Sequence, residues 1–290
     1  MTKKRWATAL FAAGASVLPS LAVAPSLDPR RALDEMARAA ASVRDYTMTL
    51  VTQEWDHGAL GPPQTLMSKW ARPFQVYFKR LCAPHKGREI LFSPGWNEGR
   101  LKVSLHTWPL NVSLNIDPHG SLAMGGTHHP VNETSMIYLI DVVLENFEKA
   151  DAKGDATVED LGPETILGRI CDRVRLRARW SSTSWKLAPG ETLWDAVKRF
   201  DIAMAPLLHA NAALGWETPS DAKAGQTISI PGYYAARVDL WIDRELRLPL
   251  RAEIFDGDDA LFERFEHRDL RVNVGLGPID FSPSNPEYEF

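Results

Sequence analysis

Histidine and carboxylate side chains gather in one stretch of the sequence, between Asp117 and His129. His119, His128 and His129 lie there with Asp117, and imidazole and carboxylate groups are ligands that suit zinc. The stretch is rich in glycine and proline, and it contains no His-Glu-x-x-His helix to hold two imidazoles on one face. We therefore predict no metal site and no cofactor.

A nucleophile is suggested by Cys82, because His85 follows it closely and could act as its base. A Cys-His nucleophile needs a spatial arrangement that two neighbours in a turn rarely provide. The sequence also contains no Gly-x-Ser-x-Gly turn, which weakens the interpretation as a serine hydrolase. We nominate no catalytic residue from these patterns.

Two acidic pairs, Glu263 with Glu266 and Asp258 with Asp259, could in principle cleave a glycosidic bond. Glycosidases use two carboxylates at a defined separation across the site, and a sequence does not give that separation. We interpret both pairs as exposed charges on a strand and in a turn, and we predict a non-enzymatic protein.

Four arginines alternate with apolar residues from Arg173 to Arg179. On a strand Arg173, Arg175, Arg177 and Arg179 point to one side, so they could hold an anionic polymer or a lipid headgroup. The same alternation is typical of any antiparallel strand with one solvated face. We favour the solvated face.

These side chains must be positioned by a sheet, because most of the chain reads as short strands joined by turns. Alternating apolar residues and Gly, Pro and Asn turns predict successive hairpins and a meandering antiparallel sheet. The expected strands are residues 45–55, 66–72, 74–78, 89–92, 101–106, 157–160, 170–179, 236–243, 249–255 and 261–273. Residues 111–131 show no regular pattern.

Two helices accompany these strands. Asp28 and Pro29 can cap and open the first, and the second is expected from Glu133 to Ala150, with a wide apolar face. Such a helix needs a sheet to lie on. It is a candidate for covering a cavity, although it could equally complete the core with nothing bound.

Residues 183–232 read as a small inserted unit with the order strand, helix, helix, strand. A short strand precedes a Pro-Gly turn, a helix carries apolar residues at i, i+3, i+4 and i+7, and a second short helix ends near Asn211. A last strand, at residues 227–230, ends before Pro231.

This unit resembles the LysM carbohydrate-binding module. The resemblance rests on residues 190–194 (GETLW), Asn211, and the pairs at 225–226 (GQ) and 230–231 (IP). It implies binding of N-acetylglucosamine polymers such as peptidoglycan or chitin. By resemblance the binding residues are Gly190, Glu191, Thr192, Leu193 and Asn211. The apolar side chains along one face of such a helix, however, more often belong to the core than contact a ligand.

The surrounding chain, residues 28–180 and 236–290, resembles a bacterial family of unknown function placed near the LolA/LolB lipoprotein carriers. The resemblance rests on strand ends and turns at residues 69–74 (KWARPF), 86–89 (KGRE), 117–120 (DPHG), 240–243 (LWID) and 248–251 (LPLR). It implies a strongly curved antiparallel half-barrel, closed by helices over an apolar cavity.

Residues 1–24 read as a secretory signal peptide. Lys3, Lys4 and Arg5 precede an apolar run that ends in small residues, and we favour cleavage after Ala22, although the segment could persist as an anchor. Removing these three charges changes the net charge from -4 to -7, which does not favour a nucleic-acid partner.

Export would bring Cys82 and Cys171 into an oxidising compartment, where they could pair or remain as two buried thiols. Together these patterns predict an α+β protein, exported and periplasmic. A LolA-like curved antiparallel sheet with covering helices would bind a lipid, a lipoprotein or another apolar ligand, and a LysM-like βααβ insert would bind peptidoglycan. The alternatives are a cell-wall hydrolase and a structural envelope protein without a ligand.

Overall fold

The structure is a computed structural model. It describes residues 27–290 apart from residue 57 and residues 107–110. The predicted signal peptide, residues 1–24, lies outside the described residues, as does the favoured cleavage site after Ala22. Across the described residues, no helix has both the length and the apolar composition needed to cross a bilayer.

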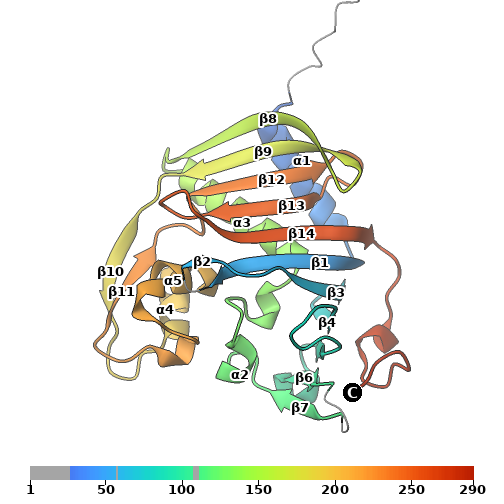
Figure 1. The fold of residues 1–290 in the computed structure, drawn as a ribbon. Coiled ribbons are helices and arrows are strands. Elements are labelled where there is room, and N and C mark those ends of the chain that lie inside the picture. The colour runs from blue at the N-terminus through green and yellow to red at the C-terminus, as the bar shows by residue number, and fades with distance from the viewer. Residues whose placement is uncertain (1–26, 57, 107–110) are drawn as a thin grey trace, which may run out of the picture.

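One large, curved antiparallel sheet dominates the molecule, as predicted (Figure 1). It has 12 strands in the order β7-β6-β5-β4-β3-β1-β14-β13-β12-β9-β8, and the short β2 pairs with β1. The strands are β1 (Asp45–Asp56), β2 (Ala59–Leu60), β3 (Gln64–Ala71), β4 (Gln75–Arg80), β5 (Glu89–Phe92), β6 (Leu101–Ser104), β7 (Ser113–Ile116), β8 (Ala156–Ile166), β9 (Arg169–Ala178), β12 (Arg237–Asp243), β13 (Pro249–Phe255) and β14 (Leu261–Val272).

Strand β1 shows how the sequence sets the two faces of the sheet. Tyr46, Met48 and Leu50 alternate with partly exposed threonine and valine residues, and successive side chains of a strand point to opposite faces. We call the face with these three residues the inner face, and the opposite one the outer face. The register continues the pattern, because Leu50 stands opposite Leu66 in β3.

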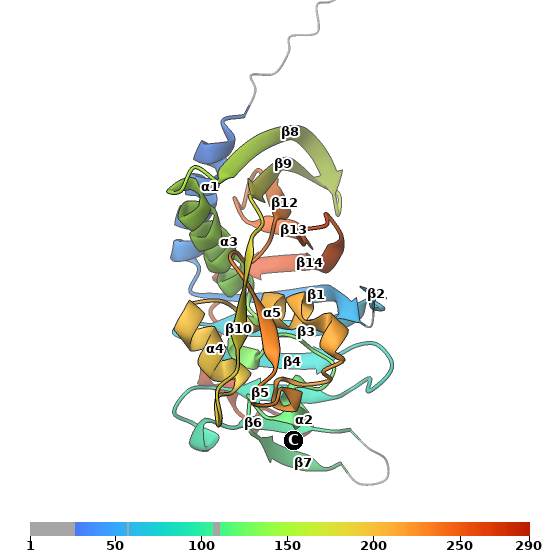
Figure 2. The same ribbon diagram turned by 90° about the vertical axis from the view of Figure 1, so that its left-hand side faces the viewer.

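Two helices, α1 (Pro29–Ser42) and α3 (Met136–Asp151), pack against the inner face (Figure 2). The side chain of Asp28 accepts the backbone N–H of Arg30, and proline occupies the first helical turn, as expected. Helix α3 begins at Met136, three residues after the predicted start, because Ser135 caps it.

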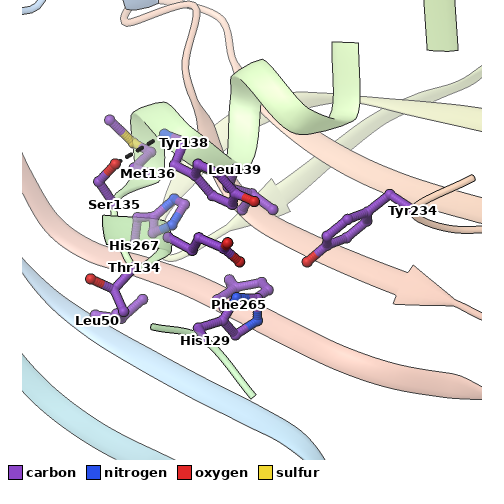
Figure 3. Close-up of a pocket in the computed structure, with 11 residues that line it drawn as sticks. Leu50, His129, Thr134, Ser135, Met136, Tyr138, Leu139, Tyr234, Phe265 and His267 are labelled. Atoms are coloured by element: carbon purple, nitrogen blue, oxygen red, sulfur yellow. Dashed lines mark hydrogen bonds between the residues drawn. The ribbon is translucent and has the colours of Figure 1, made fainter. Parts of the chain in front are cut away.

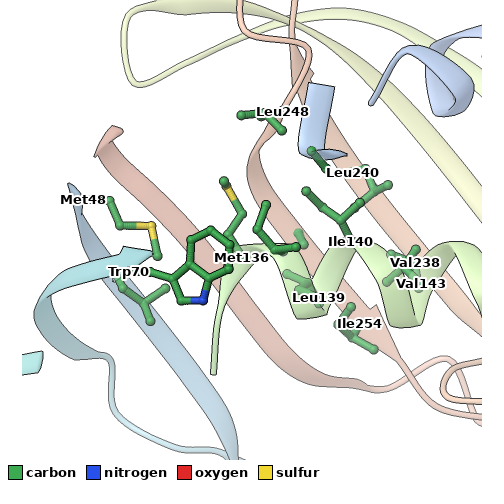
Figure 4. Packing of buried hydrophobic residues seen from close by; sticks show 14 of the residues in the cluster. Met48, Trp70, Met136, Leu139, Ile140, Val143, Val238, Leu240, Leu248 and Ile254 are labelled. Atoms are coloured by element: carbon green, nitrogen blue, oxygen red, sulfur yellow. The ribbon is translucent and has the colours of Figure 1, made fainter. Parts of the chain in front are cut away.

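The main core lies between α3 and strands β12, β13 and β14 (Figure 4). Leu139, Ile140 and Val143 of α3 pack there against Val238 and Ile254. Of the two roles predicted for this helix, completing the core is therefore confirmed.

The C-terminal segment covers part of the outer face beside β4 and β5. Tyr288 stacks on Tyr77 with ring centroids 3.8 Å apart, and both belong to an apolar cluster with Leu91. Lys69 on β3 binds Asp280 at 2.8 Å. The segment thereby shields apolar side chains of the outer face from water.

Residues 182–231 form the predicted strand, helix, helix, strand unit. Strand β10 (Ser182–Lys186) pairs antiparallel with β11 (Thr227–Pro231), and helices α4 (Leu193–Phe200) and α5 (Met204–Ala210) lie between them in sequence. We call this unit the βααβ module. Its apolar cluster includes Leu193, Leu207 and Ile228, and also Met124 from the large-sheet domain.

The βααβ module is docked on the large sheet through His209 of α5. The imidazole Nε2 of His209 lies 2.8 Å from the Asp256 carboxylate in the β13–β14 turn. The same ring stacks on Phe262 with centroids 4.5 Å apart and meets the edge of Trp55. The module and the sheet therefore share a packed interface.

The segment predicted to be irregular contains two elements missed from the sequence, β7 and the short helix α2 (Ser121–Met124), and the two-residue strand β2 was missed as well. Strand β7 is four residues long and pairs only at the sheet edge with β6. Alternation over so few residues is too short to stand out. Short 3-10 helices complete the described chain at Asn97–Gly99, Val131–Glu133, Ala212–Leu214, Pro219–Asp221 and Pro278–Phe281.

The disulfide that the sequence left open is not formed, because Cys82 and Cys171 are both free thiols. Cys82 follows β4 and Cys171 lies on β9, six steps away along the sheet. At about 4.8 Å a step this is roughly 29 Å, whereas bridged cysteines need Cα atoms about 5.5 Å apart.

The outer-face cluster should contribute strongly to stability. We expect Tyr288→Ala to lower the free energy of unfolding by about 3 kcal/mol or more, since it removes a buried aromatic ring and its hydrogen bond to the Asp280 carbonyl. Urea denaturation measures the change. Glu287→Ala, at an exposed position one residue away, is the control, and equal stabilities of the two variants would contradict the prediction.

Candidate functional site

A cavity of about 360 Å³ lies on the inner face, at the end of the sheet that α1 and α3 leave uncovered. Phe78, Ile90, Val103 and Leu114 stand opposite one another across β4, β5, β6 and β7. All four line the cavity, as do Leu66 on β3 and Leu122 and Ala123 of α2. The period-two pattern of four short strands therefore supplies an apolar wall.

A larger hollow of about 660 Å³ adjoins the cavity. Its walls come from the β1–β2 turn, from residues 84–88, and from the segment after α5 in the βααβ module, which includes Trp216. The residues that line both spaces are Glu54, Gln64, Arg80, Arg88, Gly125, Gly126 and Thr127. The cavity therefore opens into a polar mouth, and the module forms one side of it.

Beside the cavity, near the start of α3, buried polar groups meet. The Nε2 of His129 lies 2.8 Å from one oxygen of Glu263, and the hydroxyl of Tyr234 donates to the other at 2.7 Å. Figure 3, which does not draw Glu263, shows His129 and Tyr234 among the residues that line a small pocket here, with Phe265 of β14 beside His129. We call His129, Tyr234 and Glu263 the buried polar triad.

Within the buried polar triad, His129 and Glu263 form an ion pair. Burial alone would lower the pKa of His129, but the charge and hydrogen bond of Glu263 outweigh it and raise that pKa to about 9. Burial would raise the pKa of Glu263, but His129 and the Tyr234 hydroxyl lower it. Both groups are therefore charged at neutral pH, and the Nδ1 of His129 has no partner among the described residues.

Sequence reasoning missed this triad. We interpreted Glu263 and Glu266 as exposed charges, which is wrong, because both side chains are buried. Three residues apart on a strand, they point to opposite faces, and Glu266 pairs on the outer face with Arg251 and Arg268. They cannot act as a glycosidase pair on one substrate. Asp258 and Asp259 are exposed in a turn, as predicted.

The residues that the sequence analysis weighed as metal ligands are dispersed. The Asp117 carboxylate accepts the backbone N–H of His119, and the His119 ring lies 4.4 Å from that of Trp194 in the module. Burial lowers the pKa of His128, and His129 belongs to the triad. Within the described residues, no group of three or more His, Cys, Asp or Glu side chains is arranged to hold a metal.

The thiol of Cys82 is turned toward β3. Its Sγ accepts the backbone N–H of Thr65 at 3.3 Å, whereas no contact joins it to His85 in the part of the chain that the structure describes. His85 is exposed and has a positive φ of 66°. The structure thus does not assemble the Cys-His pair that the sequence suggested.

The residues predicted to bind a glycan have structural contacts. Gly190 has a φ of +78° in the turn before α4, which favours glycine. Glu191 accepts the indole N–H of Trp185, and Thr192 caps α4 with Asp195.

The other two predicted glycan residues are buried. Leu193 lies in the module core. The side chain of Asn211 lies under β11, where it donates to the carbonyl of Ser229 and accepts the N–H of the same residue. Gly190, Glu191, Thr192 and Leu193 thus form one turn, while Asn211 holds α5 to β11.

The alternating arginines lie on the outer face of β9. Arg173 and Arg175 both bind Asp239 of β12, at 2.8 and 2.7 Å, and Arg177 lies 3.9 Å from both Glu159 and Asp259. Carboxylates thus offset the positive charge of this stripe. The interpretation as an ordinary half-solvated strand fits these pairings better than an anion site.

Fold and site together define an α+β protein whose curved antiparallel sheet encloses an apolar cavity beside a polar mouth. The chain belongs to the family described as "Protein of unknown function (DUF1571)", which it matches over residues 43–205 and 224–290. The match includes every strand of the large sheet and leaves out residues 206–223, within the βααβ module. Among curated proteins, none matches this sequence.

Several solved structures are similar to this chain at low identity. MucB is 12% identical, and the match covers 89% of this chain and 63% of MucB with a TM-score of 0.44. The lipoprotein LppX of Mycobacterium tuberculosis is 11% identical, with 87% and 99% covered and a TM-score of 0.41. A LolA superfamily protein of Nitrosomonas europaea is 10% identical, with 89% and 98% covered and a TM-score of 0.29. This chain thus spans less than two thirds of MucB.

The triad makes stability depend on pH. A histidine whose pKa rises from 6.5 to about 9 on folding stabilises the fold fully below about pH 6.5, and this contribution is lost as the pH rises toward 9. The lowered pKa of Glu263 acts only at acidic pH. Over the alkaline window we expect wild type to lose up to roughly 3 kcal/mol relative to the double variant His129→Gln/Glu263→Gln.

Urea unfolding of both proteins between pH 6 and pH 9.5 measures this difference. The double variant lacks both titrating groups, so its stability serves as the reference at each pH. Parallel profiles for the two proteins would show that folding does not raise the pKa of His129 and would contradict the assignment.

Proposed function

We propose that this protein is an exported envelope protein that binds an apolar ligand, namely a lipid or the lipid-modified part of a lipoprotein, in the cavity on the inner face. Its volume of about 360 Å³ lies within the range of roughly 300–1,000 Å³ typical of small-molecule sites. The predicted signal peptide, residues 1–24, supports export.

The observation that carries the proposal is an apolar wall that neither α1 nor α3 covers. Leu66, Phe78, Ile90 and Val103 line the cavity, while at the other end of the same face α3 covers equivalent side chains completely. Apolar surface left facing water costs about 25 cal/mol per Å². At the rim, Leu122 of α2 is 78% exposed. A bound hydrocarbon chain would cover both the wall and this rim.

A tryptophan in the wall should block the cavity. Ile90 stands between Phe78 and Val103, and we expect Ile90→Trp to weaken binding of N-phenyl-1-naphthylamine, a neutral apolar fluorophore, by roughly tenfold or more. Preventing the burial of about 60 Å² of ligand surface corresponds to that factor. The fluorescence increase on titration into the mature protein measures the affinity.

Val112→Trp is the matched control for the blocking variant. Val112 is exposed and does not line the cavity, so the same new side chain should leave the affinity unchanged. Cooperative urea unfolding of both variants confirms that they are folded. If wild type fails to bind the fluorophore, or if both variants bind it equally well, the proposed function is wrong.

We further propose that the βααβ module binds peptidoglycan. The order of strands and helices in the module and the turn at residues 190–193 support this proposal. The burial of Leu193 and Asn211 weighs against direct contact from their side chains, so a sugar would meet the backbone of the turn. The two binding roles are compatible, because one would locate the protein and the other would hold its ligand.

Sedimentation with insoluble peptidoglycan tests the module. We expect wild type to sediment with peptidoglycan and not with cellulose. Pro189→Trp places a large side chain at an exposed position beside the turn at residues 190–193, so it should obstruct the turn and abolish sedimentation with peptidoglycan. Lys198→Trp, exposed on α4, should leave the sedimentation unchanged. Wild type that stays in the supernatant would contradict glycan binding and leave the cavity proposal untouched.

A further inference from the structure

We propose that Arg80 and Arg88 bind an anionic headgroup, so that the ligand of the cavity is an amphiphile with a hydrocarbon chain and a carboxylate or phosphate at one end. This inference rests on the proposed function, because the chain of the amphiphile would occupy the apolar cavity. It adds the chemical class of the ligand and the residues that select it.

The two arginines lie at the boundary between the cavity and the mouth. Arg80 ends β4 and Arg88 precedes β5, and the backbone N–H of Arg80 donates to the carbonyl of Arg88 at 2.9 Å. They are thus directly opposite each other across a hairpin. Both line the apolar cavity and the polar mouth, which is where the headgroup of a chain inside the cavity would lie.

Opposed like charges destabilise a sheet, and within the described residues no carboxylate lies within ion-pair distance of either guanidinium. The arginines of the outer face differ, since Arg173 and Arg175 share Asp239. Burial and the charge of Arg80 lower the pKa of Arg88. The charge of Arg88, with burial and Arg80, lowers the pKa of the exposed His85. Arg80, Arg88 and His85 therefore form a basic edge of a mouth that Glu54, Asp56 and Glu217 also line.

The hydrogen-bonding groups of the pair also lack acceptors. The Nε atoms of Arg80 and Arg88 are buried and have no partner among the described residues. A guanidinium presents its donors in a planar fork that fits the two oxygens of a carboxylate or phosphate. An anion between the two side chains would offset both the repulsion and the unmet donors.

The carboxylate at the same boundary, Glu54, is engaged elsewhere. It accepts the hydroxyl of Thr127 at 3.1 Å and the backbone N–H of His128 at 2.6 Å. These bonds tie it to the segment before α3, and it forms no ion pair with either arginine within the described residues. It thus leaves the pair available to a ligand.

Competition against N-phenyl-1-naphthylamine tests the inference with three palmitoyl compounds that share one chain. Palmitic acid carries a carboxylate, palmitoyl lysophosphatidic acid carries a phosphate, and monopalmitoylglycerol is neutral. Below their micelle concentrations, we expect one or both anionic compounds to displace the fluorophore from wild type at about tenfold lower concentration than the neutral one. The more effective of the two identifies a fatty acid or a phospholipid as the source.

The double variant Arg80→Gln/Arg88→Gln should lose this preference and still bind the fluorophore and the neutral compound within about twofold of wild type. Arg38→Gln/Arg271→Gln removes the same net charge at exposed positions outside the cavity, and it should keep the preference. Equal competition by all three compounds in wild type, or a preference that survives in the Arg80/Arg88 variant, would overturn the inference alone. Wild type that does not bind the fluorophore would overturn the proposed function as well.

Discussion

Helix α3 is too short to cover the sheet on which it lies, and this mismatch of lengths shapes the molecule. Its 16 residues make a helix about 24 Å long, which spans five steps between strands at about 4.8 Å each. The backbone N–H of Met136, at its first turn, donates to the hydroxyl of Tyr46 on β1, and its contacts reach β9 and β8 at the far end. The six strands from β1 to β8 are thus covered, and those from β3 to β7 are not.

This end of the sheet keeps the same period-two pattern, so it presents apolar side chains that face only the short helix α2 and the cavity. On the outer face the C-terminal segment covers part of β3, β4 and β5 through Tyr288 and Phe290, whereas the cavity lies on the inner face. The βααβ module, anchored by His209 against Asp256, forms one side of the mouth. A cavity with a polar entrance follows from this arrangement, and a ligand that is apolar at one end fits it.

Local patterns in the sequence predicted the elements well and their long-range partners poorly. The alternation in β1 and the apolar face of α3 each lie within a single element, and both elements formed where expected, α3 a few residues later than predicted. The His129–Glu263 pair joins residues 134 positions apart, so neither residue signals the other. Arg80 and Arg88 lie opposite each other across a hairpin, which the turn at residues 86–89 could have suggested. That neither forms an ion pair with a carboxylate among the described residues is known only from the three-dimensional structure.

The central claim is that a hydrocarbon chain occupies the inner face beneath α2, and photo-crosslinking tests it most directly. A palmitic acid with a diazirine near the chain end, irradiated with the mature protein and located by peptide mass spectrometry, should modify inward-facing residues such as Leu66, Phe78 and Ile90. An excess of unlabelled palmitic acid should suppress these adducts. Adducts confined to the C-terminal segment or to the βααβ module, or labelling that unlabelled palmitic acid does not suppress, would contradict the account.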